Sequence, residues 1–391
     1  MKWRLMDDAI SFSDKLELAR FVLTTNKFTN GEKVKQLENA WNEWLGSKHS
    51  LFVSSGSTAN FLLVAAIKEK YNLKSGDKVL VPACTWMTNV APIIQLGLQP
   101  IFCDINFDDF SFDETELEYV ASQHNDIKLI FVTHLLGFAS NTRIDGKLEK
   151  YFPNALIIDD VCESHGCKYR NGYKVGSNSL GATFSTYFGH HLTTIEGGFV
   201  STDDSDLFDL MRMKRSHGMA RESLFYEKYA NNHKDIDKQF LFITDGYNFR
   251  NTELGAVLGL SQLNKLDNSI SIRNKNYRYF YAMLKTYENL FYNTKYQPLT
   301  ISSFCFPFIC RTDEIYNKLK SRLQDNDIEY RPIVSGNLLK QPFLKGYNLC
   351  TNRDINYTNV EILHKHGLYI GNSQFINDKH LKKLESILEW I

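Results

Sequence analysis

The chain has 391 residues, and its 45 basic and 45 acidic side chains balance to zero net charge. That length allows two domains with ample cores, and the zero net charge gives no electrostatic reason for nucleic acid or an anionic membrane as the main partner. Because no apolar run approaches the roughly 18 residues of a membrane span, residues 1–8 lack a signal-peptide core, and the seven cysteines form no CxxC pair, we predict a soluble cytoplasmic protein.

Short apolar, β-branched runs alternate with amphipathic stretches through roughly the first two hundred residues. The apolar runs predict strands over residues 51–53, 79–81, 100–103, 129–132, 156–158, 182–187 and 198–202. The amphipathic stretches predict helices over residues 33–44, 58–70, 113–123 and 204–214. This alternation predicts an α/β fold with a mostly parallel sheet that helices cover on both faces.

A long helical pattern begins near residue 252, runs to about residue 284 and leads into a second region. That region contains a β-like segment over residues 303–309 and helical patterns over 313–324 and 378–390. The chain has no repeat, no low-complexity stretch and no Pro/Gly-rich linker. We therefore predict a large domain over residues 1–255 packed against a smaller α+β domain over 256–391, with the extreme N-terminus able to pack on the smaller domain.

Polar residues follow several of the predicted strands, where ligands gather in parallel sheets. The turn from Ser54 to Thr58 presents backbone N–H groups to an anion at a helix N-terminus, although serine and threonine there also simply cap helices. Asp159 and Asp160 follow the strand over 156–158. A carboxylate at that point can pair with a protonated pyridine nitrogen, whereas its neighbour in sequence can be an ordinary structural acid.

Three further segments carry groups that suit a flat, phosphorylated ligand. Trp86 follows the strand over 79–81, where its indole can lie on a heteroaromatic ring or simply belong to the core. Asn248 and Arg250 stand on a turn before the long helix, and Arg221 lies on a similar basic turn. Arginine forks suit phosphate, but an exposed arginine can also serve only solubility.

Taken together and in this order, the motifs resemble the sugar-nucleotide aminotransferase family, a branch of the fold-type I pyridoxal-phosphate enzymes, over essentially the whole chain. The resemblance implies that Gly56 and Ser57 grip the cofactor phosphate and that Trp86 stacks on its ring. It also implies that Asp160 pairs with the pyridine nitrogen. Asn248 matches a residue that reaches the phosphate of the neighbouring subunit's cofactor, which makes a homodimer with shared sites the expected active unit.

The chain departs from the family where the catalytic lysine is expected, because His190 and His191 stand there instead. Counting from the preceding strand aligns the lysine with His191, while counting back from Glu196 aligns it with His190. We take His191 as the catalytic acid/base. The hydroxyl five residues earlier, which binds phosphate in the family, is then Thr186, and Glu163 takes the cofactor-binding place of the family's glutamine.

The histidine pair, residues 331–337 and residues 366–372 together resemble a dehydratase subgroup of this family. The resemblance implies a non-covalently bound pyridoxal or pyridoxamine phosphate, L-glutamate as amino donor and a substrate like GDP-4-keto-6-deoxymannose. The expected reaction removes the C3 hydroxyl of the sugar and releases ammonia. Four residues are candidates for sugar or diphosphate contacts: Arg221, Arg250, Arg331 and Asn337.

Two other functions remain open at this point. One is a 3-dehydratase that depends on an iron–sulfur cluster and a reductase, although the next cysteine after His191 is Cys305 and no set of four clustered thiolates is apparent. The other is a sugar-nucleotide-binding protein of the same fold without catalytic activity. The sequence gives no metal-ligand set, so we expect no metal.

Overall fold

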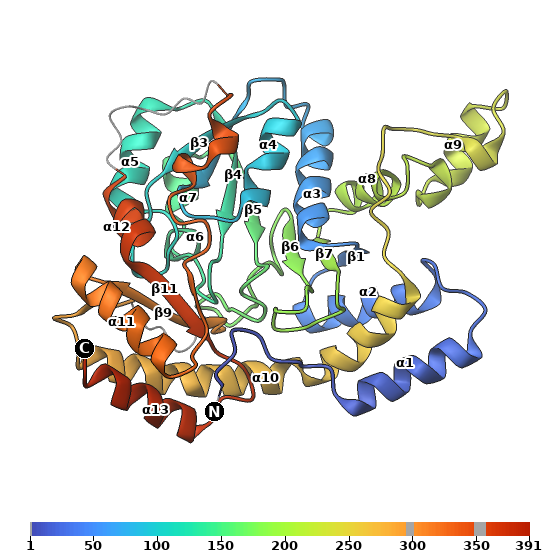
Figure 1. The fold of residues 1–391 in the computed structure, drawn as a ribbon. Coiled ribbons are helices and arrows are strands. Elements are labelled where there is room, and N and C mark those ends of the chain that lie inside the picture. Colours follow the sequence, from blue (N-terminus) through green and yellow to red (C-terminus); the bar gives the residue numbers. More distant parts are fainter. Residues whose placement is uncertain (1, 295–300, 348–356) are drawn as a thin grey trace.

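The computed structural model of the protein describes residues 2–294, 301–347 and 357–391. Within these residues, seven strands form a mixed sheet in the order β1-β7-β6-β5-β4-β2-β3 (Figure 1). The strands are β1 His49–Val53, β2 Lys78–Pro82, β3 Gln99–Cys103, β4 Ile127–Thr133, β5 Leu156–Asp160, β6 Ala182–Ser185 and β7 Gly198–Thr202. Only β7 runs against its neighbours, β1 and β6. The predicted α/β class with a mostly parallel sheet is confirmed.

Helices cover both faces of this sheet. One face packs on α3 (Gly56–Lys70) and α8 (Ser205–Arg215). The other face packs on α2 (Glu32–Leu45) and, farther along, on α5 (Glu114–Gln123) and α7 (Lys147–Tyr151). The remaining helices of this part are α1 Phe12–Thr24, α4 Ala91–Gln95, α6 Asn141–Ile144 and α9 Tyr226–Asn232. The sequence analysis did not predict α1.

Side-chain alternation along the strands explains why both faces are buried. In β2, Val79 and Val81 belong to the core under α3, whereas Leu80 between them belongs to the opposite core. Successive strand residues point to opposite faces, so an apolar run of this kind needs cover on both sides. On the second face, Trp41 of α2 stacks on Phe199 of β7 with ring centroids 4.3 Å apart, which fixes α2 against the sheet.

A second, antiparallel sheet lies in the smaller C-terminal domain. Its order is β10-β11-β9-β8, and α11 and α13 pack beside it. The elements are β8 Phe291–Tyr292, β9 Cys305–Cys310, α11 Asp313–Asp325, β10 Tyr330–Pro332, α12 Thr358–His366, β11 Gly367–Gly371 and α13 Asp378–Leu388. None of the helices in the described ranges is both long enough and apolar enough to cross a membrane.

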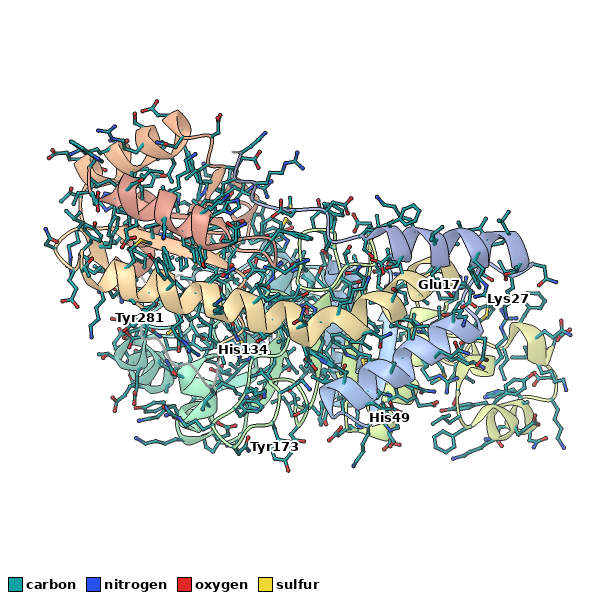
Figure 2. All side chains as sticks on the ribbon, turned by 90° about the horizontal axis from the view of Figure 1, so that it is seen from below. Glu17, Lys27, His49, His134, Tyr173 and Tyr281 are labelled. Carbon is teal, nitrogen blue, oxygen red and sulfur yellow. The ribbon has the colours of Figure 1, made fainter. Side chains whose placement is uncertain are left out.

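The helix α10 (Glu253–Lys285) connects the two parts of the molecule and runs along its length (Figure 2). It begins at Thr252, whose side chain accepts a hydrogen bond from the N–H of Gly255. Its first half joins the core around Trp41, and its second half joins the core of the smaller domain. Residues on the middle of α10 therefore lie between the two cores, where they can reach a site at the boundary.

The N-terminal segment lies against the smaller domain. The indole N–H of Trp3 donates to the carbonyl of Gly371 over 2.8 Å, and Trp3 pairs with Ile328 in an isolated parallel bridge. The side chain of Trp3 is almost completely buried. This anchor holds the residues that follow it, including Met6, over the edge of the large sheet. The division at residue 255 stays a prediction.

Candidate active site

Five strand ends meet at one edge of the large sheet, beside a cavity of about 360 Å³. The strands β1, β2, β4, β5 and β6 run in the same direction, because β7 is antiparallel to both β1 and β6. Their carboxyl ends therefore share this edge, the usual place for a ligand. Residues from the large domain that line the cavity include Ser55, Gly56, Ser57, Trp86, Asn89, Asp160, Glu163, Ser185 and His190.

The turn between β1 and α3 forms one end of the cavity. Ser55 caps α3, since its hydroxyl accepts from the N–H of Thr58 over 3.1 Å. Gly56 and Ser57, the next two residues, line the cavity and bring the positive end of the helix to it. A side chain at position 56 has no room, because its Cβ would lie 2.6 Å from the Cβ of Ser185. Both interpretations of the turn therefore apply: Ser55 caps the helix, and Gly56 and Ser57 offer an anion site.

Asp160 lies at the end of β5 and is held by three donors. Its Oδ2 accepts from the side-chain amides of Asn60, at 3.0 Å, and Asn89, at 2.8 Å. Its Oδ1 accepts from the N–H of Cys162 at 2.8 Å. The carboxylate is only 4 % exposed and lines the cavity. Three hydrogen bonds fix its position, which suits a group that must meet one ring nitrogen.

Asp159, one residue earlier, faces away from the cavity. It is fully buried, accepts from His134 Nε2 at 3.0 Å and from the hydroxyl of Ser179, and lies 3.4 Å from Arg143 Nε. Burial raises the pKa of Asp159, but Arg143, His134 and Ser179 outweigh this effect and lower the pKa to about 2. Asp159 is therefore a structural ion-pair partner, as expected for one of two adjacent acids on a strand.

Glu163 occupies the position where the family has glutamine. Its Oε2 accepts from the N–H of Leu136 at 3.0 Å. Burial raises the pKa of Glu163 to about 7, and the charge of Asp160 acts in the same direction. Near neutral pH this carboxyl is therefore partly protonated and can offer an O–H to the cavity, as a glutamine offers an N–H.

Replacing Glu163 with glutamine is expected to change how stability depends on pH. The folded state holds this proton more tightly than the unfolded chain, so the native protein loses stability as pH rises from the ordinary glutamate pKa of 4.5 through about 7. Glutamine does not titrate. The unfolding temperature of Glu163→Gln minus that of the native protein should therefore increase between pH 5 and pH 8. A difference that stays constant over this range would contradict the raised pKa.

The structure places His190, not His191, in the wall of the cavity. Burial lowers the pKa of His190 to about 4, and the positive charge of Arg273 contributes to this, so the imidazole is neutral at pH 7. His191 points elsewhere: its Nε2 donates to the carbonyl of Ser302 over 3.1 Å. Of the two registers that the sequence left open, the geometry brings the one with His190 into the site.

The same shift of one residue applies to the hydroxyl five positions earlier. Thr186 is fully buried and shares a hydrogen bond with Thr194 between their side-chain oxygens, outside the cavity wall. Ser185, five residues before His190, lines the cavity beside Gly56. The predicted strand over 182–187 was too long, since β6 ends at Ser185. The register that the sequence analysis preferred, with Thr186 and His191, therefore places neither side chain in the cavity wall.

The other predicted site residues divide into two groups. Trp86 is 54 % exposed and Arg331 is also exposed, and both line the cavity. The remaining four lie outside its wall in this chain: Arg221, Asn248, Arg250 and Asn337. Arg250 Nε donates to the side-chain oxygen of Asn248 at 3.1 Å. Asn337 is a structural cap, since its side-chain oxygen accepts from the N–H of Leu339.

The residues that the fold brings to the cavity and that sequence reasoning missed include Met6, Asn89, Ser185 and Arg273. Ser185 was within reach of the alternative register. Asn89 follows β2 by seven residues and carries no motif of its own. Met6 and Arg273 are distant in sequence, and only the packing of the N-terminal segment and of α10 places them here.

These residues fit a flat, phosphorylated pyridine. The cradle at the β1 end excludes side chains at two positions, because a Cβ on Gly198 would lie 2.7 Å from the backbone nitrogen of Gly56. Gly56 and Ser57 lie at a helix N-terminus that favours a phosphate. At the other end, Asp160 is fixed for a protonated ring nitrogen. The residues that would hold the group are therefore Gly56, Ser57, Ser185, Trp86 and Asp160.

The fold and this site define the class of fold-type I pyridoxal-phosphate proteins. A model of the DegT/DnrJ/EryC1/StrS aminotransferase family matches residues 11–384, and the chain belongs to that family. It is 35 % identical over 388 residues to GDP-4-keto-6-deoxy-D-mannose 3-dehydratase of Yersinia pseudotuberculosis, covering 96 % of this chain and 95 % of the relative.

Two solved structures of GDP-4-keto-6-deoxymannose-3-dehydratase, each with a TM-score of 0.89, cover 99 % of this chain and 100 % of their own. One, 32 % identical, is a histidine-to-asparagine variant with bound GDP-perosamine. The other, 31 % identical, holds a trapped PLP-glutamate geminal diamine.

Proposed function

We propose that the chain is a coenzyme B6-dependent 3-dehydratase that removes the C3 hydroxyl of a 4-keto-6-deoxy sugar nucleotide. The observation that carries this proposal is His190 in the cavity wall, beside residues that fit the phosphate, the ring and the ring nitrogen of the cofactor. No lysine is among the described residues that line the cavity. Lysine forms a Schiff base with an aldehyde, whereas imidazole only transfers protons. An intact cofactor site without the lysine favours proton-transfer chemistry over ordinary transamination.

Each residue then has a definite task. Bound pyridoxamine phosphate supplies an amine for the sugar's keto group and a ring that accepts electrons. Asp160 keeps the ring nitrogen protonated, and Gly56 and Ser57 hold the phosphate. His190 is neutral at pH 7 and can take up a proton. Once protonated it is a strong acid for an imidazole, so it returns the proton readily to the departing hydroxyl at sugar C3.

The substrates are proposed from the relatives. The structure with GDP-perosamine and the Yersinia dehydratase support a substrate like GDP-4-keto-6-deoxymannose. The structure with the glutamate adduct supports L-glutamate as the amino donor. The overall reaction balances: glutamate and the 4-keto sugar nucleotide give 2-oxoglutarate, the 3-deoxy sugar nucleotide and ammonia.

The active unit in this proposal is a cytoplasmic homodimer with shared sites. Three predicted site residues lie outside the cavity wall of their own chain: Arg221, Asn248 and Arg250. Apolar side chains near them are exposed, including Leu224, Phe240 and Phe242. A second copy that covers these side chains would bring the polar residues toward the neighbouring cavity. Light scattering on the purified protein tests this assembly, and a monomer at micromolar concentration would exclude it.

Product analysis tests the proposed reaction. We expect purified protein with cofactor, glutamate and GDP-4-keto-6-deoxymannose to give a 3-deoxy sugar nucleotide and one equivalent of free ammonia, as measured by mass spectrometry and an ammonia assay. The CDP-linked 4-keto sugar in parallel reports the preference for the nucleotide. An aminosugar product without ammonia release would mean that the protein is a transaminase and would refute the dehydratase proposal.

A further inference from the structure

Arg273 is a buried cation in the cavity wall, and the proposed dehydration assigns no role to it. It lies in the middle of α10, is 6 % exposed and lines the cavity that contains His190. Burial lowers the pKa of Arg273 to about 10, so the guanidinium stays charged near neutral pH. A charge removed from water is costly unless an opposite charge or several hydrogen bonds compensate. The hydrogen bonds and charges around the guanidinium therefore show whether it still needs an anion.

Backbone carbonyls hold the guanidinium in place. Its Nη1 donates to the carbonyl of Phe304 at 3.1 Å and to that of Asn372. Asn372 in turn donates through its side-chain amide to the carbonyl of Arg273 and to the hydroxyl of Ser303, each at 2.9 Å. Asn372 closes the segment 366–372 that marked the dehydratase subgroup in the sequence. These contacts fix the orientation of the arginine without neutralising it.

The guanidinium keeps an unused donor. Its Nε is buried and has no hydrogen-bond partner among the described residues. No carboxylate is ion-paired with Arg273 in that part of the chain, and the acid that acts on it at longer range is Asp7. The side chain of Asp7 already accepts from the hydroxyl of Ser373 at 2.6 Å. A rigid, charged, incompletely bonded guanidinium at a cavity is suited to a planar anion.

We propose that Arg273 binds one carboxylate of a dicarboxylic amino donor in the inner cavity. This inference rests on the proposed function. The ring of Phe304 lies 5.5 Å from that of His190, and the carbonyl of Phe304 accepts from Arg273. Phe304 therefore lies between Arg273 and His190. A small amino acid that reacts beside His190 can span this separation with its carboxylate.

The diphosphate of the sugar nucleotide is the other anion that the cavity must receive, and Arg331 is better placed for it. Arg331 is exposed at the cavity, on β10 of the smaller domain. A diphosphate carries a nucleoside that needs a path to solvent, so it belongs at an exposed cation. A small dicarboxylate fits the buried one. Arg331 therefore suits the diphosphate at the exposed part of the cavity, and Arg273 suits the amino donor at its buried part.

Titration of the holoenzyme with glutarate tests this assignment, because glutarate has both carboxylates of glutamate but no amine. We expect Arg273→Gln to weaken glutarate binding, measured by calorimetry, by at least about 30-fold. Arg273→Lys keeps the charge without the fork and should give an intermediate loss. In the glutamate half-reaction, followed by the absorbance of the cofactor, the KM for glutamate should rise far more than kcat falls. GDP binding should change less than about twofold.

Arg278→Gln is the matched control, since Arg278 is an exposed arginine on the same helix. It should bind glutarate as the native protein does. Thermal unfolding identifies a variant that fails to fold, in which case Arg273→Lys carries the test. Glutarate binding unchanged in a folded Arg273 variant, or an equal loss of GDP binding, would overturn the assignment. Dehydration by enzyme already loaded with pyridoxamine phosphate is measured separately, so failure of the proposed function itself is distinguishable.

Discussion

Replacing His190 with asparagine is expected to lower kcat for dehydration by about 1,000-fold, the typical contribution of a positioned acid/base. Asparagine keeps a polar group of similar size but cannot take up a proton. The fold and the cofactor affinity should be preserved, because His190 makes ring contacts with Tyr187, Phe304 and His165, and its hydrogen bond with the backbone of Cys162 is one that an amide can also make. Release of ammonia and of the 3-deoxy product measures the loss, and a cofactor titration measures the affinity.

His191→Asn is the matched control for this prediction. Its imidazole donates to the carbonyl of Ser302 and lies outside the cavity wall, so we expect a loss in kcat below about tenfold, accompanied by some loss of stability. The opposite pattern, with His191 essential and His190 dispensable, would restore the register that the sequence analysis preferred and would refute the proposal for His190.

The pH dependence gives an independent check on the same residue. The pKa of His190 is lowered to about 4, mainly by burial. A base must be unprotonated to act, so kcat/KM should be constant from about pH 5 upward with respect to this group and should fall as pH drops through about 4. A fall centred near pH 6.5 would show that the base is an ordinary exposed imidazole.

The sequence located the histidine pair but preferred His191, and the structure places His190 in the cavity wall. The pattern of β-branched and apolar residues predicts a strand before the histidine pair. Where this strand, β6, ends is set by its pairing with β7, and the last pair is Ser185 with Gly198. The residues beyond it, 186 and 187, still have strand-like side chains. The end of a strand depends on its partner and not on its own composition.

Four of the positions that the sequence predicted and the structure places in the cavity share a simple property. Gly56, Ser57, Trp86 and Asp160 all follow a recognisable apolar strand, and parallel strands bring their carboxyl ends together whatever the rest of the chain does. Arg273 has no such signal. It lies in the interior of a long helix, and only the packing of α10 against both cores turns it toward the cavity.

Asp160→Asn is the second change with a large expected effect. A carboxylate that meets a protonated ring nitrogen makes a charge-assisted hydrogen bond worth about 3 kcal/mol, which corresponds to about 100-fold in rate. An amide oxygen in the place of Oδ2 still accepts from Asn60 and Asn89, and only the N–H of Cys162 loses its acceptor. We therefore expect kcat to fall about 100-fold while the free energy of unfolding changes little.

Asp159→Asn should behave in the opposite way, although the two residues are adjacent in the chain. Asp159 is fully buried against Arg143 and His134, and removal of its charge leaves the guanidinium with the partly exposed Glu149 as its remaining ion-pair partner. Such a loss costs about 3 kcal/mol of stability. Because the pKa of Asp159 is lowered to about 2, its contribution to stability is present above about pH 4 and is lost as pH falls toward 2.

Urea unfolding and kcat, measured on both variants at pH 7, separate the two roles. Equal effects of the two substitutions on kcat would mean that the cavity does not distinguish the faces of β5 and would contradict the assignment of Asp160 to the cofactor.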